Sequence, residues 1–533
     1  MVRQWPDKLK TIPVIWYVAA VALLFLIARW VKKIFGFGAI GITSDYPAVT
    51  GMAIVMLILS VVAMVVILGY VLKAKEFKLH RMFLMSGLLL GCLYLFILPP
   101  LSAPDEWVHY VTAYKLSNEL LGVESVNDEG YVMVQEEEML AGDGAFPDAG
   151  QYQYFWSNFL GRETGDSMVS SKKYPNGTYA IPYIPQALGI TAARVLGLNY
   201  ATRIIFGRIC NLVWSVLAIS LAIKWIPFGK KILFGVAMLP MTLHELASNS
   251  YDAWIIGFSL MFIAYCMKLG YEKEKIENRD IVILAVLIGL LAPCKVVYTT
   301  LIGLCLLIPK EKFGTRKRWF AAAGIVLGGV MLIVLLANLR AFGFFMSEDS
   351  GYIIGWAGEP AYTISYFLEH PLEYPKIIWD TLMVGDMVYP KNYLQDMLGR
   401  VLGWLDQNLK MPQMYYQVLV FLVLGHFISA DGEAKVFRKG NKLWMALLSA
   451  ATVVLVMTSM LLSHTPLTSP HIQGVQGRYF LPILPVVALV AFKDTGLVLK
   501  KDHQKVLSST YAVFHLFLLL QLFGQVITVH LSK

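Results

Sequence analysis

The feature of this sequence that most constrains its fold is a series of long apolar runs, separated by short clusters of Lys and Arg. A run of about 20 mostly apolar residues is long enough to cross a lipid bilayer as a helix. Hydrophobic residues make up 57% of the 533 residues and charged residues 15%. Soluble domains contain about 45–50% and about 25%, respectively. This composition excludes a cytosolic enzyme and a nucleic-acid-binding domain, and it predicts a polytopic membrane protein.

The apolar runs and the basic clusters together predict a topology. The uninterrupted runs are residues 12–30, 48–72, 82–98, 203–223, 232–248, 253–269, 319–341, 413–429, 443–463, 479–493 and 507–528. A longer run, residues 279–309, is interrupted at Pro293-Cys294-Lys295 and has basic clusters on both sides. Since cytoplasmic loops carry the excess of Lys and Arg, both ends of this run face the cytoplasm, and it forms two short helices that meet outside at Lys295.

We therefore expect an all-α transmembrane bundle of about 13 spans in the cell membrane, with a cytoplasmic N-terminus and an extracytoplasmic C-terminus. The first run has basic residues on both sides and no small-residue cleavage site behind it, which favours an uncleaved span over a signal peptide.

Two long acidic segments, residues 101–180 and 342–412, lie outside in this topology. The moderately apolar stretch 181–199 cannot be a net crossing, because the chain leaves the third span outside and re-enters through the fourth. We expect it to lie along the outer interface, and we expect interfacial helices in both loop regions. The chain then divides into two N-terminal spans with a cytoplasmic loop (1–81), a transmembrane core (82–341) that includes a first outer loop (101–202), a second outer loop (342–412) and C-terminal spans (413–533).

The sharpest polar cluster follows the third span, at Pro104-Asp105-Glu106-Trp107-Val108-His109-Tyr110. In a helix, Asp105 and His109 would share a face near the outer membrane surface. The two adjacent carboxylates are candidates for a general base, with Glu106 or His109 positioning it, or for metal ligation with His109. The segment from Ser102 to Asp105 also reads as a capping box, so capping and catalysis both stay open.

Further ionisable candidates lie at the outer ends of other spans. Asp252 is in an outer turn; ionisable groups at membrane level tend to be functional, although a turn exposed to water tolerates an Asp freely. The outward-facing cations are few, namely Lys295, Arg478, Arg203 and Arg208. A phosphate at the outer leaflet is a natural partner for them, and anchoring to lipid headgroups is the alternative.

Several neighbours of these charges are candidate substrate-binding residues. They are Trp107, Tyr110, Tyr114, Tyr251 and Gln476. Aromatic rings can stack on a sugar, but anchoring at the membrane interface explains them equally well. We expect the Glu-rich segment 135–138 to be a solvated face. We expect His244 to be a polar packing residue, because His244-Glu245 lacks the second His of the zinc-protease motif.

Carboxylates paired with cations beside the lipid are what a membrane transferase needs when its donor is a lipid phosphate. A carboxylate deprotonates an acceptor hydroxyl, and a cation stabilises the phosphate that leaves.

Several separate motifs between about residues 85 and 490 resemble the domain-of-unknown-function 2142 family of bacterial multi-pass membrane proteins. They are Pro104-Asp-Glu-x-x-His109, Lys173-Tyr-Pro175 with Ile181-Pro-Tyr-x-Pro185-Gln-Ala-Leu-Gly189, Leu239-Pro-Met-Thr with Ser250-Tyr-Asp252-Ala, Pro293-x-Lys295, Tyr366-Phe-Leu-x-His370-Pro-Leu, Gly403-Trp-Leu-Asp406 and Gln476-Gly-Arg-Tyr-Phe-Leu-Pro482.

That family in turn resembles the GT-C superfamily of membrane glycosyltransferases. The resemblance implies a catalytic Asp in the first outer loop at Asp105, a second acidic residue at Asp252, and a Lys between two short helices at Lys295. It implies inverting transfer of a sugar from a polyprenyl-phosphate or diphosphate donor, with Lys295, Arg478 and Arg203 as candidates to hold the donor phosphate. The expected partners are this donor, membrane lipid and a glycan or envelope-polymer acceptor, with no nucleic acid. The resemblance makes no cofactor certain, and use of a divalent metal is left open.

Two other classes stay open on the sequence. A lipid-linked glycan flippase or transporter predicts a charged path through the bilayer centre, whereas few ionisable residues lie deep inside the expected spans. A non-catalytic scaffold of an envelope-synthesis complex predicts that the outer loops are docking surfaces.

Overall fold

A computed structural model describes residues 47–74, 76–141, 149–177, 179–346, 353–383, 393–403, 410–428, 436–494 and 503–528. The expected first span at residues 12–30 lies outside these ranges, and so does Asp406.

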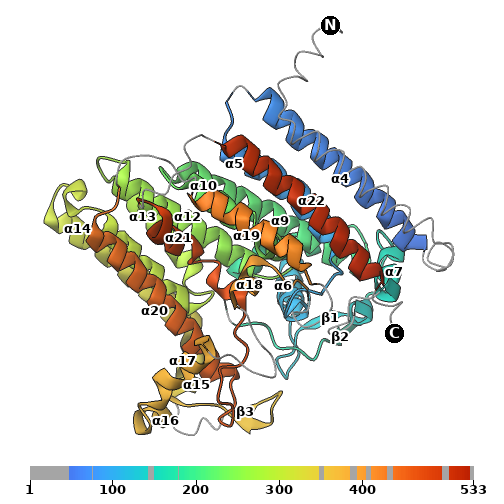
Figure 1. The fold of residues 1–533 in the computed structure, drawn as a ribbon. Helices are drawn as coiled ribbons and strands as arrows, with labels where there is room; N and C mark the ends of the chain where they lie inside the picture. Colours follow the sequence, from blue (N-terminus) through green and yellow to red (C-terminus); the bar gives the residue numbers. More distant parts are fainter. Residues whose placement is uncertain are drawn as a thin grey trace, which may run out of the picture.

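Helices dominate the described chain, as expected for an all-α fold (Figure 1). Among the described residues, seven helical segments are long and apolar enough to cross a membrane, and each coincides with a run that the sequence predicts as a span. They are α4 (Pro47–Lys73), α5 (Leu79–Ile97), α9 (Tyr200–Trp225), α12 (Asp252–Tyr271), the joined segment Arg316–Ala337, α20 (Lys439–His464) and α22 (Gln504–Thr528). The joined segment contains α14 (Arg316–Ala323), a π-helical turn (Gly324–Gly328) and the first half of α15 (Gly329–Met346).

The other helices are shorter than a full span. They are α6 (Glu106–Leu121), α7 (Ala149–Ser157), α8 (Ile184–Val195), α10 (Lys230–Ala237), α11 (Pro240–Leu246), α13 (Asn278–Leu291), α16 (Ile364–Glu369), α17 (Glu373–Met383), α18 (Tyr393–Leu398), α19 (Gln413–Ile428) and α21 (Leu484–Phe492). The 3-10 helices are Glu136–Ala141, Ile181–Tyr183, Val296–Leu307, Lys310–Phe313 and Gly477–Phe480.

The expectation of one continuous helix is wrong for two of the predicted runs. Residues 232–248 form α10 and α11, which are separated just before Pro240. Residues 479–493 form the end of a 3-10 helix followed by α21, with Pro485 in the first turn of α21. Proline lacks the amide hydrogen that a continuing helix needs, so each run breaks there. By contrast, the predicted break in residues 279–309 is confirmed, because α13 ends at Leu291 and a 3-10 helix begins after Lys295.

The break between α10 and α11 frees carbonyl groups inside the bundle, and side chains satisfy two of them. The ring nitrogen Nε2 of His515 on α22 lies 2.6 Å from the carbonyl oxygen of Met238. The hydroxyl of Thr242 donates to the carbonyl of Val236 at 2.8 Å. A buried carbonyl without a partner would cost about 1–3 kcal/mol, so these contacts make the break a stable part of the fold.

The strands and some of the short helices gather at one end of the bundle. Figure 1 shows α6, α18, α16 and α17 at the lower end of the drawing, together with strands β1, β2 and β3. Within the described residues the strands form two short antiparallel pairs, β1 (Met133–Gln135) with β2 (Met168–Ser170) and β3 (Ile353–Ile354) with β4 (Glu359–Pro360). The two predicted outer loops therefore lie at the same end of the bundle.

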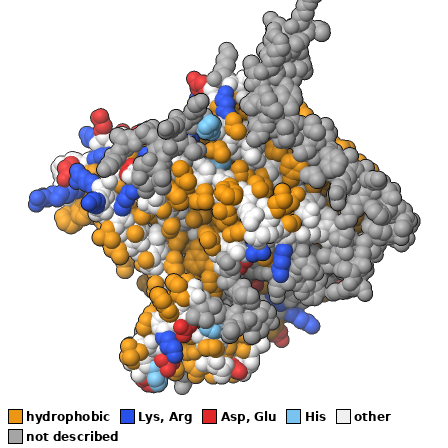
Figure 2. Space-filling model, in the orientation of Figure 1, with side chains coloured by type: hydrophobic (Ala, Val, Ile, Leu, Met, Phe, Trp, Pro, Cys, Tyr) orange, Lys and Arg blue, Asp and Glu red, His pale blue; other side chains and the backbone are white. Residues whose placement is uncertain are grey.

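Burial separates central helices from peripheral ones. Helix α12 is the most enclosed candidate span, whereas α4 and the segment Arg316–Ala337 bury less than a third of their apolar windows. Figure 2 shows a broad band of hydrophobic side chains across the visible face, with Lys and Arg side chains gathered at one margin. An apolar outer surface of this kind is expected where helices face lipid.

Candidate functional site

The chain enters the site at the turn between α5 and α6, where Asp105 precedes the first residue of α6. Asp105 has φ 61°, in the left-handed region, which costs a non-glycine residue about 1–2 kcal/mol. Its side chain forms no capping hydrogen bond with α6, and 61% of that side chain is exposed. The expected capping role is therefore absent, and the carboxylate of Asp105 faces solvent.

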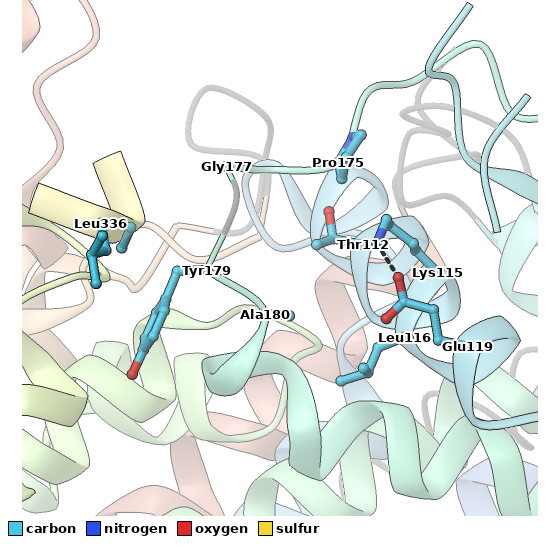
Figure 3. A pocket seen from close by; sticks show the side chains of 10 residues that line it. Thr112, Lys115, Leu116, Glu119, Pro175, Gly177, Tyr179, Ala180 and Leu336 are labelled. Atoms are coloured by element: carbon cyan, nitrogen blue, oxygen red, sulfur yellow. Dashed lines mark hydrogen bonds and ion pairs between the residues drawn. The ribbon is translucent and has the colours of Figure 1, made fainter. Parts of the chain in front are cut away.

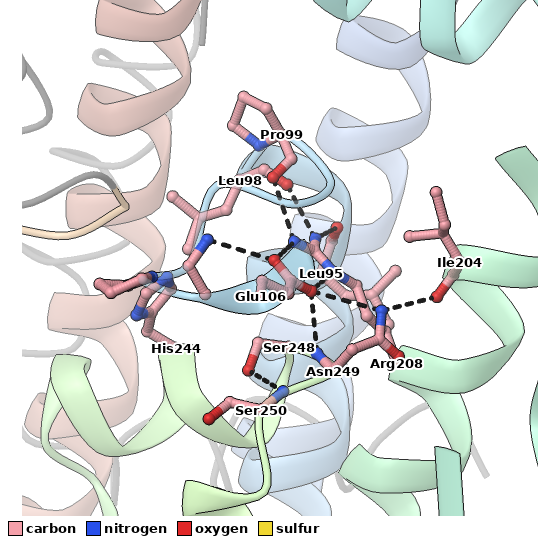
Figure 4. Close-up of polar contacts among 12 residues, drawn as sticks. Leu95, Leu98, Pro99, Glu106, Ile204, Arg208, His244, Ser248, Asn249 and Ser250 are labelled. Atoms are coloured by element: carbon pink, nitrogen blue, oxygen red, sulfur yellow. Dashed lines mark hydrogen bonds and ion pairs between the residues drawn. The ribbon is translucent and has the colours of Figure 1, made fainter. Parts of the chain in front are cut away.

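Glu106, the next residue, points the other way and is fully buried (Figure 4). Arg208 of α9 binds its carboxylate with two hydrogen bonds, from Nε to Oε1 at 2.7 Å and from Nη2 to Oε2 at 2.6 Å. The same guanidinium donates to carbonyl oxygens at the end of α5 and in the following turn, those of Leu95, Leu98 and Pro99. The backbone amide of Asn249 also donates to Glu106, at 2.8 Å. Glu106 thus joins α5, α6, α9 and the loop before α12, and no part of it is exposed.

Arg478 lies on the other side of this turn, in the 3-10 helix Gly477–Phe480, and contacts three carboxylates. Its Nη1 lies 3.2 Å from Oε1 of Glu245, and its Nε lies 3.2 Å from Oδ2 of Asp252. Its Nη2 lies 3.5 Å from Oδ2 of Asp105. The Arg478 side chain is 2% exposed, so it links the exposed Asp105 to a charged interior.

Lys295 extends the same network. Its Nζ lies 3.1 Å from Oδ1 of Asp252, and it sits 4.0 Å from the ring centre of Tyr479 and 5.3 Å from that of Tyr251. A quarter of the Lys295 side chain is exposed. We call Asp105, Glu245, Asp252, Lys295 and Arg478 the carboxylate–cation network. It contains three acidic and two basic side chains, and it combines residues from four separate parts of the sequence.

His109 borders the network and stays neutral near pH 7. Burial lowers its pKa to about 4, although the nearby carboxylates of Asp252 and Asp105 raise it in part. Its Nδ1 lies 2.8 Å from the hydroxyl of Tyr183, and its ring lies 4.8 Å from that of Tyr251. Within the described residues no group of three His, Cys, Asp or Glu side chains is placed to hold a metal ion.

Arg203, which the sequence grouped with the phosphate-binding candidates, belongs to a different cluster. It is fully buried and pairs with Glu137, Glu138 and Glu163 of the first outer loop, at 3.0, 2.9 and 2.7 Å. The expectation that residues 135–138 form a solvated face is therefore wrong for Gln135, Glu137 and Glu138, which are all buried. This cluster fastens the loop to the first turn of α9.

Some of the candidate aromatic residues likewise lie in the network and others lie outside it. Tyr110 donates to Glu138 at 2.8 Å and stacks on Trp107, and Tyr114 packs against Arg194. All three rings, those of Trp107, Tyr110 and Tyr114, are buried. Tyr251 instead lies beside Lys295 in the network. Gln476 precedes the Arg478 turn, and its buried Oε1 is among the described side-chain atoms that have no hydrogen-bond partner.

Glu245 is the network member that sequence reasoning missed. The absence of a second His argued against a zinc-protease motif and drew attention away from this carboxylate. A stronger signal was available, because an ionisable residue inside an apolar run is expensive and needs a partner. Arg478 is that partner, more than two hundred residues away in the chain.

A cavity of about 460 Å³ lies beside α6, between its exposed face and the middle of α15 (Figure 3). Lys115 and Glu119, an ion pair, line it on one side, and Leu336 lines it on the other. Thr112, also in the wall, accepts a hydrogen bond from the backbone of Asn176 at 2.9 Å. The amide of Asn176 contacts Tyr183, the partner of His109, at 2.8 Å. The cavity therefore has a polar and an apolar wall, and it is connected to the network through Asn176 and Tyr183.

A family model described as "Predicted membrane protein (DUF2142)" matches residues 88–487. No curated protein and no solved structure matches the chain. The match includes every member of the carboxylate–cation network, and it covers well over half of the sequence. The chain, a predicted multi-pass membrane protein, therefore belongs to the DUF2142 family.

Proposed function

We propose that this protein is a GT-C-like glycosyltransferase that moves a sugar from a polyprenyl-phosphate or diphosphate donor to a cell-envelope acceptor at the outer membrane face. One observation carries the proposal. Asp105 presents an exposed carboxylate at the edge of a buried network that contains two cations, Arg478 and Lys295. Its φ of 61° is strained, and backbone strain of this kind clusters at functional sites.

The network suits an inverting displacement. Asp105 accepts the proton of the acceptor hydroxyl as the hydroxyl oxygen attacks the anomeric carbon. The bond between that carbon and the phosphate oxygen breaks, and the phosphate leaves with the bonding electrons. A cation placed where this charge develops stabilises the transition state.

Lys295 is the better placed cation to meet the departing phosphate, because a quarter of its side chain is exposed whereas Arg478 is enclosed. In this proposal Arg478 holds Asp105 and Asp252 at fixed positions, and Asp252 orients Lys295. Tyr251 and Tyr479 flank the ammonium group and limit its movement.

The cavity beside α6 supports a donor that is part lipid. Its apolar wall comes from the candidate span Arg316–Ala337 and its polar wall from α6, so a chain leaving the bilayer and a polar headgroup would each meet a matching surface. Arg203, buried among three glutamates, is not part of this proposal.

For the topology we propose 13 crossings, with a cytoplasmic N-terminus and an extracytoplasmic C-terminus. The seven long candidate spans supply part of this count. In this proposal six more crossings complete the count. The region of residues 12–30, the pair α10 and α11, α19 and α21 supply one each, and the two helices on either side of Lys295 supply two. This arrangement places the carboxylate–cation network on the extracytoplasmic side.

The test compares envelope glycans and the polyprenyl-phosphate pool, by mass spectrometry, in a strain that lacks the gene and in strains rescued with the wild-type chain or with Asp105→Asn. Loss of a general base typically lowers the rate about 10²–10⁴-fold, so the Asp105→Asn strain should lack the same sugar as the deletion strain. Asp166→Asn, a change at an exposed carboxylate of the same loop, is the matched control and should restore the sugar.

Equal protein levels in the membrane fraction are required for the comparison. Full rescue by Asp105→Asn would remove the base assignment. Rescue even by a chain lacking both Asp105 and Asp252 would favour a non-catalytic scaffold, and an accumulated lipid-linked glycan that is complete but untransported would favour a flippase.

A further inference from the structure

The segment 353–383 of the second outer loop contains a helical hairpin, α16 and α17, that packs on one end of the long helix α20. Six buried residues form a small core between them, namely Tyr362, Ile377, Met457, Leu461, Ile472 and Val475. The hydroxyls of Tyr374 on α17 and Thr458 on α20 lie 2.6 Å apart. This core is separate from the main core of the bundle.

The hairpin also has an apolar face that no described residue covers. On and just before α17, the outward positions are Leu372, Pro375, Trp379, Leu382 and Met383, which recur at helical spacing. Leu372 is 82% exposed, Trp379 61% and Met383 63%. Leu368 and Ile364 on α16 are also exposed. Soluble surfaces rarely carry a contiguous apolar patch of this kind, so the face needs a partner.

The position of the hairpin along α20 identifies the partner. Thr458 lies within the last two turns of α20, which ends at His464. Leu447, Val454 and Leu455, closer to the middle of the same candidate span, are exposed apolar residues. Figure 1 shows α17 beside the lower end of α20, with α16 below it. Val454 lies one helical turn before Thr458, the residue that contacts α17, so exposed apolar residues of the candidate span lie next to the hairpin, near the end of that span.

We propose that the α16–α17 hairpin is embedded in the interfacial layer of the bilayer, with Leu372, Trp379 and Met383 inserted among the lipid headgroups and upper acyl chains. Tryptophan is enriched at this depth because its ring is apolar and its N–H needs a polar partner. The charged side chains of Glu373 and Lys376 are exposed beside the apolar face, as in helices that lie in the interface plane. Lipid would cover both the exposed apolar residues of α20 and the neighbouring face of the hairpin. A second copy of the chain or another protein would not require these two surfaces to be neighbours, so their proximity favours lipid.

The hairpin precedes a helix that supports the site. Helix α18, which follows α17 in the chain, packs against the turn that carries Arg478: a Cβ added at Gly477 would lie 2.3 Å from the backbone nitrogen of Met397. The hairpin and the helix that supports the Arg478 turn thus belong to the same predicted outer loop, residues 342–412. The inference does not depend on the proposed chemistry.

Spin labels on single introduced cysteines test the proposal in liposomes of phosphatidylglycerol and phosphatidylethanolamine. Leu372→Cys and Trp379→Cys report on the hairpin, Leu447→Cys on the candidate span, and Asp166→Cys on an exposed position of the first outer loop. The chain without an introduced cysteine gives the background from its five native thiols. Collision with apolar oxygen and with a water-soluble nickel chelate is measured for each label.

We expect the oxygen-to-nickel collision ratio at residues 372 and 379 to exceed that at 166 several-fold and to approach that at 447. A ratio equal to that at 166 would place the hairpin in water and overturn the proposal. Exclusion of both probes would mean that protein covers the face, which would also overturn it. Because both side chains are largely exposed, neither substitution removes a packing contact that the fold needs.

Discussion

Two arginines on α9, Arg203 and Arg208, are both buried, but they hold different parts of the molecule. Arg203 binds three glutamates of the first outer loop, and Arg208 binds Glu106 at the start of α6. Each cation is desolvated and remains stable only because carboxylates lie within about 3 Å of it. At the scale of single residues, stability near the site therefore depends on matched buried charges.

Glu106→Gln tests this dependence. The substitution keeps the shape of the side chain but leaves Arg208 buried without a counter-charge. Breaking a buried ion pair costs about 3–5 kcal/mol, and we expect a loss of this size in the free energy of unfolding measured with denaturant in detergent micelles. Glu119→Gln breaks the partly exposed pair with Lys115 and should cost less than about 1 kcal/mol. Equal losses in the two variants would contradict the assignment.

Protonation of His109 gives a second prediction. Its pKa falls from 6.5 in an exposed state to about 4 in the fold, so the unfolded chain takes up a proton in this range before the folded chain does. His109 therefore makes the free energy of unfolding decrease as the pH falls from about 6.5 to 4, by at most about 3 kcal/mol.

His109→Gln retains a polar group near Tyr183 but cannot titrate. The difference in melting temperature between pH 7.5 and pH 5 should be smaller in this variant than in the wild-type chain, while acidic groups contribute equally to both. An unchanged difference would show that His109 is not the titrating group. Asp105, Asp252, Lys295 and Arg478 face the ring from the neighbouring elements and remain in both chains.

Those charged residues of the candidate site that have an unusual position in the sequence could be predicted from the sequence. Asp105, Asp252, Lys295 and Arg478 stand at the ends of apolar runs, and the structure brings these four together. The partners of Arg203 and Arg208 could not be found in this way, because Glu138 and Glu106 are 65 and 102 residues away. Local sequence does not indicate which charges will be buried together.

At the scale of elements, the site depends on breaks in helices. Arg478 lies in a 3-10 helix, Glu245 in the short α11, and Lys295 between α13 and another 3-10 helix. The positions of the basic clusters predict the break at Lys295. Both ends of that run carry such a cluster, so both ends lie on the same side of the membrane. Hydropathy alone misses the breaks in residues 232–248 and 479–493, since averaging over a run does not register a single proline.

Gly477→Ala tests the contact between two of these elements. The added Cβ would lie 2.3 Å from the nitrogen of Met397 and 2.5 Å from the carbonyl oxygen of Tyr393, and both atoms belong to the backbone of α18. We expect a loss of about 1–3 kcal/mol in the free energy of unfolding, because backbone atoms cannot move aside easily.

Gly440→Ala is the matched control, because no atom lies within 4 Å of the added Cβ near the start of α20. Alanine is a better helix former than glycine, so this variant should be as stable as the wild-type chain or more stable by up to about 1 kcal/mol. If both variants have wild-type stability, α18 does not support the Arg478 turn.

At the scale of the whole molecule, the two outer loops gather at one end of the bundle. If this end is extracytoplasmic, a single cysteine introduced at the exposed Asp166 should react in intact cells with a maleimide that cannot cross the membrane. A cysteine at Arg316, the first residue of α14 and part of a basic cluster, should react only after the cells are lysed. Labelling of Arg316→Cys in intact cells would invert the proposed topology.

Arg478 and Lys295 are already paired with carboxylates of the protein, and this pairing affects which anions can bind to them. A dissolved anion must compete with Glu245 and Asp252, which the fold holds beside the cations at high effective concentration. Free inorganic phosphate makes no second contact that would offset this competition, so it should be a poor inhibitor of the proposed sugar transfer. An anionic group on a larger molecule that also binds elsewhere on the protein can displace the carboxylates. The network would therefore select anions that are part of such a molecule over free anions of the same charge.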